Sequence, residues 1–386
     1  MSSNGNGSAL TQVSTAPLFE TQQFGRVTLP NKIAMAPMTR THSPGYVPND
    51  ENVAYYRRRA EGGVGLIITE GTNPGHPSAA GYPDVPVFDG EEALAGWKRV
   101  CDEVHAAGGY IIPQLWHCGS MRMRGTGPDP DYPPLGPSAV VHPGAAQQQG
   151  DKVEEAKEMT QQDIDDVIAS FARSAKHAEE LGFDGAEIHG AHSYLIEAFF
   201  WEYTKRRTDK YGGKTVAERA TFAVELIEAV REQVSDDFPV MLRFSQWKQG
   251  DYQHKMAPTP DHLEAFLKRL VDAGVDWFHC SNRRFNDPEF EGSDLNLAGW
   301  TKQISGKPTM TVGSVGLDLD FLHSYGGAEG HKAGLDALIH RLENKEFDMV
   351  AVGRALLSDP EWVNKVKSGR ESEIVAFERK YMKIYH

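Results

Sequence analysis

Three side chains that can stabilise a developing negative charge and deliver a proton fall within six positions near the middle of the chain. His189, His192 and Tyr194 follow a short apolar run in the segment EIHGAHSYLIEAFFWEYTKRRTDKYGG, residues 187–213. Two imidazoles and a phenol are hydrogen-bond donors that can hold an oxyanion and protonate a carbon. At the end of a barrel strand, such a cluster indicates catalysis rather than structure.

Two other interpretations of this cluster have to be weighed. The H-x-x-H spacing of His189 and His192 also occurs in metal sites, because histidine is the commonest metal ligand. No neighbouring cysteine or acidic cluster completes such a site, so we predict no metal. The three side chains would also fit a hydrophobic core. We favour chemistry, and we predict that His189, His192 and Tyr194 contact the substrate.

The composition excludes several classes of partner. The 386 residues are 40% hydrophobic and 24% charged, with a formal net charge of −14. That charge argues against broad attraction to nucleic acid or to an anionic membrane. No run of about 18 apolar residues, the length that a membrane helix needs, is present. An anionic cofactor must therefore be held by local arginines and backbone amides.

The cysteines and the first residues indicate where the protein works and how it is divided. Cys101, Cys118 and Cys280 lie far apart, and no C-x-x-C pair encodes an iron–sulfur cluster or a zinc ribbon. An odd number of cysteines without a secretory signal fits the cytoplasm. Residues 1–16 are small and polar, so we expect a flexible lead before one domain, 17–386.

Short apolar runs alternate with helical patterns along the rest of the chain. Helices are predicted where apolar residues recur at three-and-four spacing, over 91–107, 160–181, 216–234, 260–272 and 335–345. Strands are predicted over 32–37, 64–70, 110–115, 184–189, 240–245, 277–281, 309–312 and 349–353. Because the strands are apolar throughout instead of alternating, they fit a parallel sheet covered on both faces.

Eight such strand–helix units predict an α/β fold, a single-domain (β/α)8 TIM barrel. An open doubly wound sheet is the alternative, but no strand is followed by the G-x-G-x-x-G turn typical of it. Two long segments, 117–159 after the third strand and 194–214 after the fourth, are predicted insertions. Insertions on these loops are where barrels build lids and pockets.

Polar residues stand at the carboxyl end of nearly every predicted strand. Two of these ends combine glycine with a polar neighbour: Gly313-Ser314 after strand seven and Gly353-Arg354 after strand eight. In this kind of barrel, the loops after strands seven and eight commonly bind phosphate through exposed backbone amides. Alternatively, these glycines serve only to turn the chain.

Six motifs together resemble the Old Yellow Enzyme family of FMN-dependent ene reductases. They are APMTR (36–40), PQLW (113–116), EIHGAHSY (187–194), RRTDKYGG (206–213), LRFS (242–245) and VGRALLSDP (352–360). The resemblance extends from about Leu18 to the last helix. It indicates the single-domain branch, because the chain has neither the cysteine-rich cluster nor the second nucleotide domain of larger relatives.

The resemblance implies a tightly but non-covalently bound FMN. Thr39 would donate to the flavin O4, Gln114 would pair with the pyrimidine edge, and Arg243 would lie beside N1 and O2. The alternative roles are a turn cap for Thr39 and a salt bridge for Arg243. The other expected FMN contacts are Pro37, Met38 and Gly71 along the ring and Gly313, Ser314, Gly353 and Arg354 at the phosphate.

The implied reaction is the reduction of an activated alkene. NADPH or NADH would reduce the flavin and leave, and an α,β-unsaturated carbonyl or nitro compound would then enter the same space. His189 and His192 would donate to its oxygen, the flavin would give a hydride to the β-carbon, and Tyr194 would protonate the α-carbon. We expect no macromolecular partner other than a second copy, so the protein would be a monomer or a homodimer.

Three further possibilities remain open, of which the last is a non-catalytic flavin-binding or scaffold protein. A flavin dehydrogenase or demethylase acting on an amine would keep the fold, but that chemistry needs no oxyanion clamp beside a proton donor. A flavin-free phosphosugar isomerase or aldolase usually needs a catalytic lysine or carboxylate at a strand end, and none of the eight ends carries a lysine.

Overall fold

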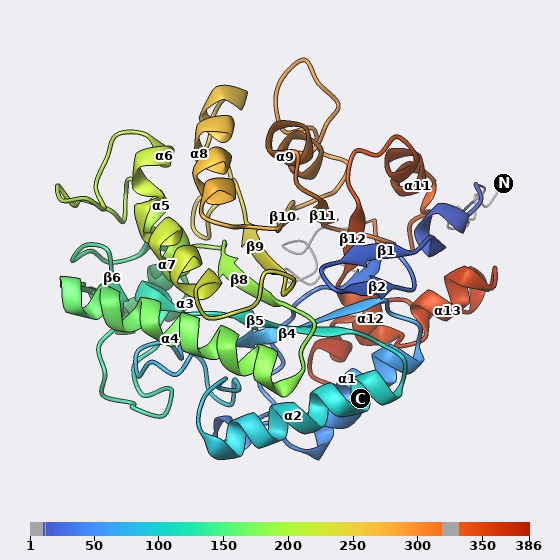
Figure 1. The fold of residues 1–386 in the computed structure, drawn as a ribbon, viewed down its shortest axis with the longest axis horizontal. Coiled ribbons are helices and arrows are strands. Elements are labelled where there is room, and N and C mark those ends of the chain that lie inside the picture. The colour runs from blue at the N-terminus through green and yellow to red at the C-terminus, as the bar shows by residue number, and fades with distance from the viewer. Residues whose placement is uncertain (1–10, 12, 319–331) are drawn as a thin grey trace, which may run out of the picture.

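Eight parallel strands form a closed barrel in the computed structural model, which describes residues 11, 13–318 and 332–386 (Figure 1). The strands follow one another around the barrel in chain order, and the last pairs with the first. They are β3 (Ile33–Met35), β4 (Leu66–Thr72), β5 (Ile111–Leu115), β8 (Ala186–Gly190), β9 (Val240–Phe244), β10 (Trp277–Ser281), β11 (Thr309–Val312) and β12 (Met349–Val352). The predicted TIM barrel is confirmed, and no predicted strand bound is wrong by more than two residues.

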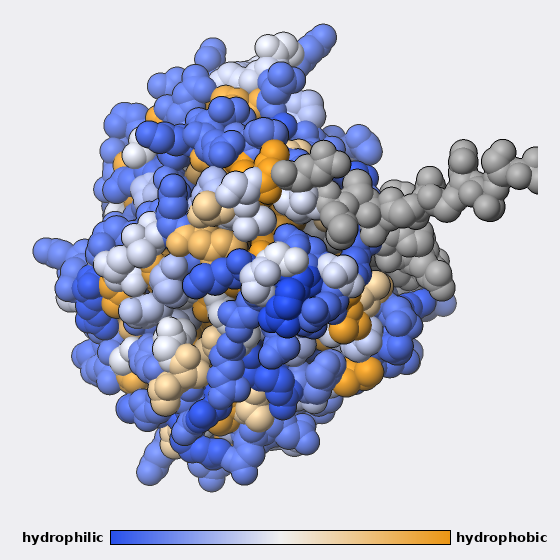
Figure 2. Space-filling model, turned by 90° about the vertical axis from the view of Figure 1, so that its right-hand side faces the viewer, coloured by the Kyte–Doolittle hydropathy of each residue, from blue (hydrophilic) through white to orange (hydrophobic). Residues whose placement is uncertain are grey.

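Helices form a ring around the barrel, which explains why the strands are apolar throughout (Figure 1). The larger helices are α1 (Asp50–Glu61), α2 (Glu91–Ala106), α4 (Gln161–Leu181), α7 (Thr221–Arg231), α8 (Pro260–Asp272), α9 (Leu297–Ser305) and α11 (Asp336–Glu343). Shorter ones are α6 (Val216–Arg219), α12 (Arg354–Ser358) and α13 (Trp362–Lys367). The face drawn in Figure 2 is mostly hydrophilic, with apolar side chains in small separate groups, as expected where helices turn polar faces outward.

The ends of α4 illustrate how the sequence defines a helix. Thr160 accepts a hydrogen bond from the backbone of Asp163, and the Asp163 carboxylate accepts one from the backbone of Thr160, which makes a capping box. At the other end Gly182 takes a φ of 91°, a left-handed conformation that glycine adopts without steric cost.

A hairpin that the sequence analysis did not predict packs across the amino ends of the barrel strands. Its strands are β1 (Gln22–Phe24) and β2 (Val27–Leu29). The ring centroids of Phe24 and Trp277 are 5.4 Å apart, and Phe24 also packs close to Gly185, just before β8. Inward-facing side chains such as Met241 and Met310 join the same buried cluster. This end of the barrel is therefore filled, and the opposite end is left for a site.

Both predicted insertions are present and pack against each other. The first contains α3 (Pro143–Gln149) and the two-residue parallel strands β6 (Leu135–Gly136) and β7 (Lys157–Glu158). The second begins with α5 (Leu195–Phe200). Arg207 in the second donates to the backbone oxygens of Pro137 and Met159 in the first, at 3.1 and 2.7 Å. The two insertions thus form one cap over the carboxyl side of β5 and β8.

Residues 1–10 and 12 lie outside the described part of the chain, and with them most of the predicted lead, 1–16. Of its remaining residues, Val13 donates its backbone N–H to the Asp336 carboxylate at 3.0 Å, and Thr11 accepts from the backbone of Leu335 at the same distance. The three cysteines are buried and form no disulfide. None of the helices in the described residues has the length and apolar composition needed to cross a membrane.

Candidate active site

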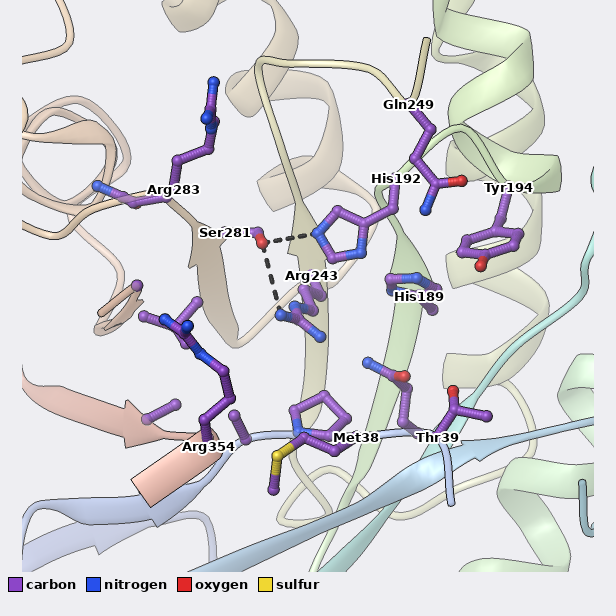
Figure 3. A pocket seen from close by; sticks show the side chains of 18 of the residues that line it. Met38, Thr39, His189, His192, Tyr194, Arg243, Gln249, Ser281, Arg283 and Arg354 are labelled. Atoms are coloured by element: carbon purple, nitrogen blue, oxygen red, sulfur yellow. Dashed lines mark hydrogen bonds between the residues drawn. The ribbon is translucent and has the colours of Figure 1, made fainter. Parts of the chain in front are cut away.

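A cavity of about 810 Å³ opens at the carboxyl ends of the strands (Figure 3). It brings together residues from all parts of the chain, because the carboxyl ends of barrel strands meet at one face. Twelve of the thirteen predicted site residues line it: Pro37, Met38, Thr39, Gln114, His189, His192, Tyr194, Arg243, Gly313, Ser314, Gly353 and Arg354.

Gly71 is the predicted site residue that does not line the cavity. It lies in β4 and is buried. A Cβ placed on it would come within 2.4 Å of the Trp116 indole, and Trp116 does line the cavity. Gly71 therefore makes room for an indole that shapes the wall.

His189, His192 and Tyr194 point into the cavity from one side (Figure 3). The two imidazole centroids are 5.1 Å apart, and the His189 and Tyr194 rings are 5.4 Å apart. The Trp116 ring meets Tyr194 edge to face at 4.8 Å. The Nδ1 atom of His189 is buried and has no hydrogen-bond partner in the protein. A buried polar atom of this kind needs a partner, and a ligand in the cavity can supply one.

His192 is fixed by two neighbours. Its Nε2 lies 2.7 Å from the Ser281 hydroxyl, and its ring stacks on Trp247 with the centroids 4.7 Å apart. Trp247 in turn donates its indole N–H to the Ser281 carbonyl at 3.0 Å. These contacts define the orientation of the imidazole before any ligand binds.

Burial keeps both imidazoles neutral. Desolvation, and then the positive charge of Arg243, hold the pKa of His189 and of His192 well below the ordinary value for histidine. A neutral ring carries one N–H, so each histidine can be a donor at one nitrogen and an acceptor at the other.

Tyr194 has a phenol neighbour. The hydroxyls of Tyr82 and Tyr194 are 3.2 Å apart, and Tyr82 also donates to the side chain of Gln148 at 3.1 Å. Burial is the main cause that raises the pKa of Tyr194 well above its ordinary value. Tyr194 is therefore protonated at neutral pH and available as a general acid.

The floor of the cavity holds a buried polar network. Gln114 donates its side-chain N–H to Glu187 at 2.6 Å, and the other Glu187 oxygen lies 2.6 Å from His279 Nδ1. This use of the amide nitrogen leaves the carbonyl oxygen of Gln114 for a ligand. Arg243 donates to the Ser281 hydroxyl at 3.4 Å, while its Nε is buried without a protein partner. Burial lowers the pKa of Arg243 to about 10, so it remains charged at neutral pH.

The opposite end of the cavity combines glycines with arginine. Gly313 has a φ of 133°, and a Cβ there would come within 2.7 Å of the Asn282 carbonyl oxygen, so this position requires glycine. Ser314 follows with a left-handed φ of 55°. Gly353 and Arg354 follow the neighbouring strand β12 and also line the cavity, where Figure 3 labels Arg354.

These residues fit FMN. The pyrimidine edge of a flavin needs both donors and acceptors, which Arg243 and Gln114 offer, and the unpartnered Nε of Arg243 points to a missing acceptor. The phosphate needs a cation and open backbone, which Arg354 and the glycine loops offer. No group of three His, Cys, Asp or Glu side chains within the described residues is placed to hold a metal ion.

Other lining residues were not among the predicted site residues: Trp116, Tyr82, Gln148, Trp247, Gln249, Ser281 and Arg283. Ser281 stands at the end of a predicted strand, so its position alone could have identified it. Gln148 from the first insertion and Gln249 from the loop after β9 carry no such signal, because only the folded loops bring them to the cavity.

Comparison with known proteins identifies the family. A model of the NADH:flavin oxidoreductase / NADH oxidase family matches residues 17–373. A flavin oxidoreductase of Emericella nidulans, hxnT, is 32% identical over 92% of this chain and 91% of its own. The 12-oxophytodienoate reductase 2 of Arabidopsis thaliana is 34% identical over 75% of this chain and 80% of its own. An NADH oxidase of Thermoanaerobacter brockii is 32% identical over 92% of this chain, which spans 52% of that longer protein.

Solved structures agree with this result. Old Yellow Enzyme from Pichia sp. AKU4542 is similar with a TM-score of 0.78 and 25% identity, over 95% of this chain and 90% of that one. Morphinone reductase in complex with tetrahydroNAD has a TM-score of 0.74 and 27% identity, over 96% of this chain and 97% of that one. The chain therefore belongs to the NADH:flavin oxidoreductase / NADH oxidase family, the Old Yellow Enzyme family of FMN-dependent enzymes that take their electrons from NADH or NADPH.

Proposed function

We propose that this protein is an NAD(P)H-dependent FMN reductase of activated alkenes. The observation that carries the proposal is the convergence of His189, His192 and Tyr194 on one side of a cavity whose floor is formed by Gln114 and Arg243. When bound, FMN accepts a hydride from NADPH or NADH and passes it to the β-carbon of an α,β-unsaturated carbonyl or nitro compound.

The two histidines bind and polarise the substrate. A carbonyl or nitro oxygen between them accepts a hydrogen bond from each ring, which draws electron density from the conjugated double bond. In this proposal the Ser281 hydroxyl, which accepts a hydrogen bond from Arg243, donates to Nε2 of His192, and the neutral His192 ring carries its proton on Nδ1. The unpartnered Nδ1 of His189 supplies the second contact.

Tyr194 delivers the proton that completes the reduction. Its O–H bond breaks as a C–H bond forms at the α-carbon, and the Tyr82 hydroxyl, 3.2 Å away, turns from Gln148 to donate to the phenolate that remains. Burial disfavours the phenolate form of Tyr194 before the reaction. Tyr194 therefore keeps its proton until the α-carbon of the substrate becomes basic enough to take it.

The flavin would be held by residues at both ends of the cavity. Arg243 would provide a permanent cation for the pyrimidine end, and the Gln114 carbonyl would accept a hydrogen bond from a ring N–H there. Thr39, Pro37 and Met38 would line the ring, with Gly71 acting indirectly by seating Trp116. Gly313, Ser314, Gly353 and Arg354 would bind the phosphate.

The purified, FMN-loaded protein tests this proposal. Under anaerobic conditions NADPH or NADH should bleach the flavin absorbance, and cyclohexenone should restore it. A methylated amine should not bleach the oxidised flavin; bleaching by the amine without any response to an alkene would favour the dehydrogenase alternative. A cytoplasmic location, and a monomer or a homodimer, remain predictions from the sequence.

A further inference from the structure

The turn that presents His192 is strained. His192 and Ser193, between β8 and α5, have φ values of 60° and 66°. Both residues therefore occupy the left-handed backbone region, which residues other than glycine rarely adopt. Two such residues in succession persist only where the surrounding structure holds them.

One buried carboxylate reaches both peptide groups of this turn. Glu197, in the first turn of α5, accepts a hydrogen bond at Oε2 from the backbone N–H of Ser193. Its Oε1 accepts from the Ser245 hydroxyl at 2.7 Å, and Ser245 Oγ accepts from the backbone N–H of His192 at 3.3 Å. The carboxylate thus holds one residue directly and the other through a serine.

The carboxylate is paired with a buried lysine. Nζ of Lys248 lies 2.9 Å from Oε1 of Glu197, and both side chains are 0% exposed. Removing two charges from water costs free energy, and hydrophobic residues can often replace such a pair without loss of stability. Neither residue lines the cavity, so neither can contact the substrate. Neither stability nor contact with the substrate therefore explains why this ion pair is present.

We infer that Glu197 and Lys248 are positioning residues, which hold the strained His192–Ser193 turn so that the His192 imidazole faces the substrate. The inference rests on the proposed function only for the role of His192. A carboxylate is needed because it offers an acceptor to Ser193 on one oxygen and to Ser245 on the other. A glutamine has a single acceptor oxygen and no charge, so Glu197→Gln must weaken one of the two links.

Steady-state kinetics with NADPH and cyclohexenone test the inference. Glu197→Gln should lower kcat/KM for cyclohexenone about tenfold, the scale of a lost charged hydrogen bond. In a His192→Ala background the same substitution should cause no further loss, because a residue that acts only through His192 has nothing left to position. A purely structural role would lower the rate equally in both backgrounds.

Glu197→Gln leaves Lys248 buried without a counter-ion, so the variant could fold poorly. The double variant Glu197→Gln/Lys248→Met removes the charge. The double variant should recover the thermal stability and FMN content of wild type yet keep the tenfold loss in kcat/KM. That result would show that the loss comes from the position of His192 and not from lower stability.

Asp348→Asn is the matched control. Asp348 likewise joins a lysine, Lys302 at 2.9 Å, to a backbone N–H, that of Thr309, but at the amino end of the barrel. This control should leave kcat/KM unchanged. Unchanged kcat/KM in the folded Glu197 variants, or losses that add to those of His192→Ala, would overturn the inference. A wild-type protein that reduces no alkene would instead refute the proposed function itself.

Discussion

The imidazole Nε2 of His192 lies 2.7 Å from the hydroxyl of Ser281, a residue 89 positions further along the chain. The contact joins the loop after β8 to the end of β10, with β9 between the two strands. The same hydroxyl accepts from Arg243 on β9, so three neighbouring strands contribute to one hydrogen-bonded chain. We propose that Arg243, by donating to this hydroxyl, sets which nitrogen of His192 is the donor.

Ser281→Ala should lower kcat/KM for cyclohexenone about tenfold. Without the hydroxyl, His192 loses the partner that sets its tautomer, while Arg243 and the flavin site remain. Stopped-flow measurement of flavin reoxidation checks this. Ser170→Ala removes a buried hydroxyl that donates to the Val167 carbonyl within α4, away from the cavity, and should have no effect on the rate. An unchanged rate in Ser281→Ala would show that Ser281 does not orient His192.

Tyr194→Phe should slow flavin reoxidation by cyclohexenone about a hundredfold, the lower part of the range for a lost general acid. Bleaching by NADPH should change little, because that half-reaction needs no proton at the substrate carbon. Tyr203→Phe, at a tyrosine that is 47% exposed, is the control. Equal slowing of both half-reactions would point to a distorted cavity instead of a lost proton donor.

Arg354→Gln should weaken FMN binding about tenfold or more, the contribution of a charged hydrogen bond to phosphate. Riboflavin lacks the phosphate, so its affinity should be the same for wild type and variant. Quenching of flavin fluorescence on titration with apoprotein measures both. The exposed Arg370 supplies the control Arg370→Gln. A similar loss for riboflavin would place Arg354 away from the phosphate.

His142 predicts a pH dependence of stability. Burial, and then Lys248, lower its pKa to about 4, so the folded protein keeps it neutral while the unfolded chain protonates it below pH 6.5. The unfolded state binds more protons in this range, so stability is present above pH 6.5 and falls as the pH drops. Protonation of His142 in the unfolded chain should lower the free energy of unfolding by about 2 kcal/mol between pH 6.5 and 5, at about 1.4 kcal/mol per pH unit.

His142→Asn removes the titrating ring and keeps an acceptor for the backbone N–H of Gly144, which His142 caps at 3.0 Å. Denaturant unfolding at pH 7 and pH 5 should therefore show a smaller loss of unfolding free energy for the variant. Parallel losses in the two proteins would contradict the lowered pKa of His142.

The barrel was predictable because its strands are continuous apolar runs between glycines and prolines, a signal that does not depend on distant residues. The β1–β2 hairpin was not predicted, since strands of three residues such as Gln22–Phe24 are too short to show a period. Helix α1 was also missed. Its sequence DENVAYYRRRAE is mostly polar, yet its buried face includes Tyr55, Tyr56 and the whole side chain of Arg59, whose guanidinium donates to the Leu356 carbonyl.

The site was predictable where chemistry-bearing residues stand at strand ends, as His189, Gln114 and Arg243 do. Its supporting contacts were not. Glu197 and Lys248 meet only when α5 and the loop after β9 fold against each other, and each alone resembles an ordinary surface charge. Gly71 differs from these residues: the family resemblance predicted a contact with the ring, but Gly71 does not line the cavity and packs against Trp116, which does.

The arrangement of His189, His192 and Tyr194 is tested most directly by one anaerobic stopped-flow measurement. FMN-loaded protein is reduced with dithionite, which needs no nicotinamide site, and mixed with cyclohexenone. Wild type should regain its flavin absorbance rapidly, and His189→Ala/His192→Ala at least about a hundredfold more slowly, with reoxidation by oxygen similar in both. Two results would contradict the proposed role of these residues. One is a wild-type flavin that is reoxidised no faster by activated alkenes than by buffer, and the other is a double variant that is reoxidised as fast as wild type.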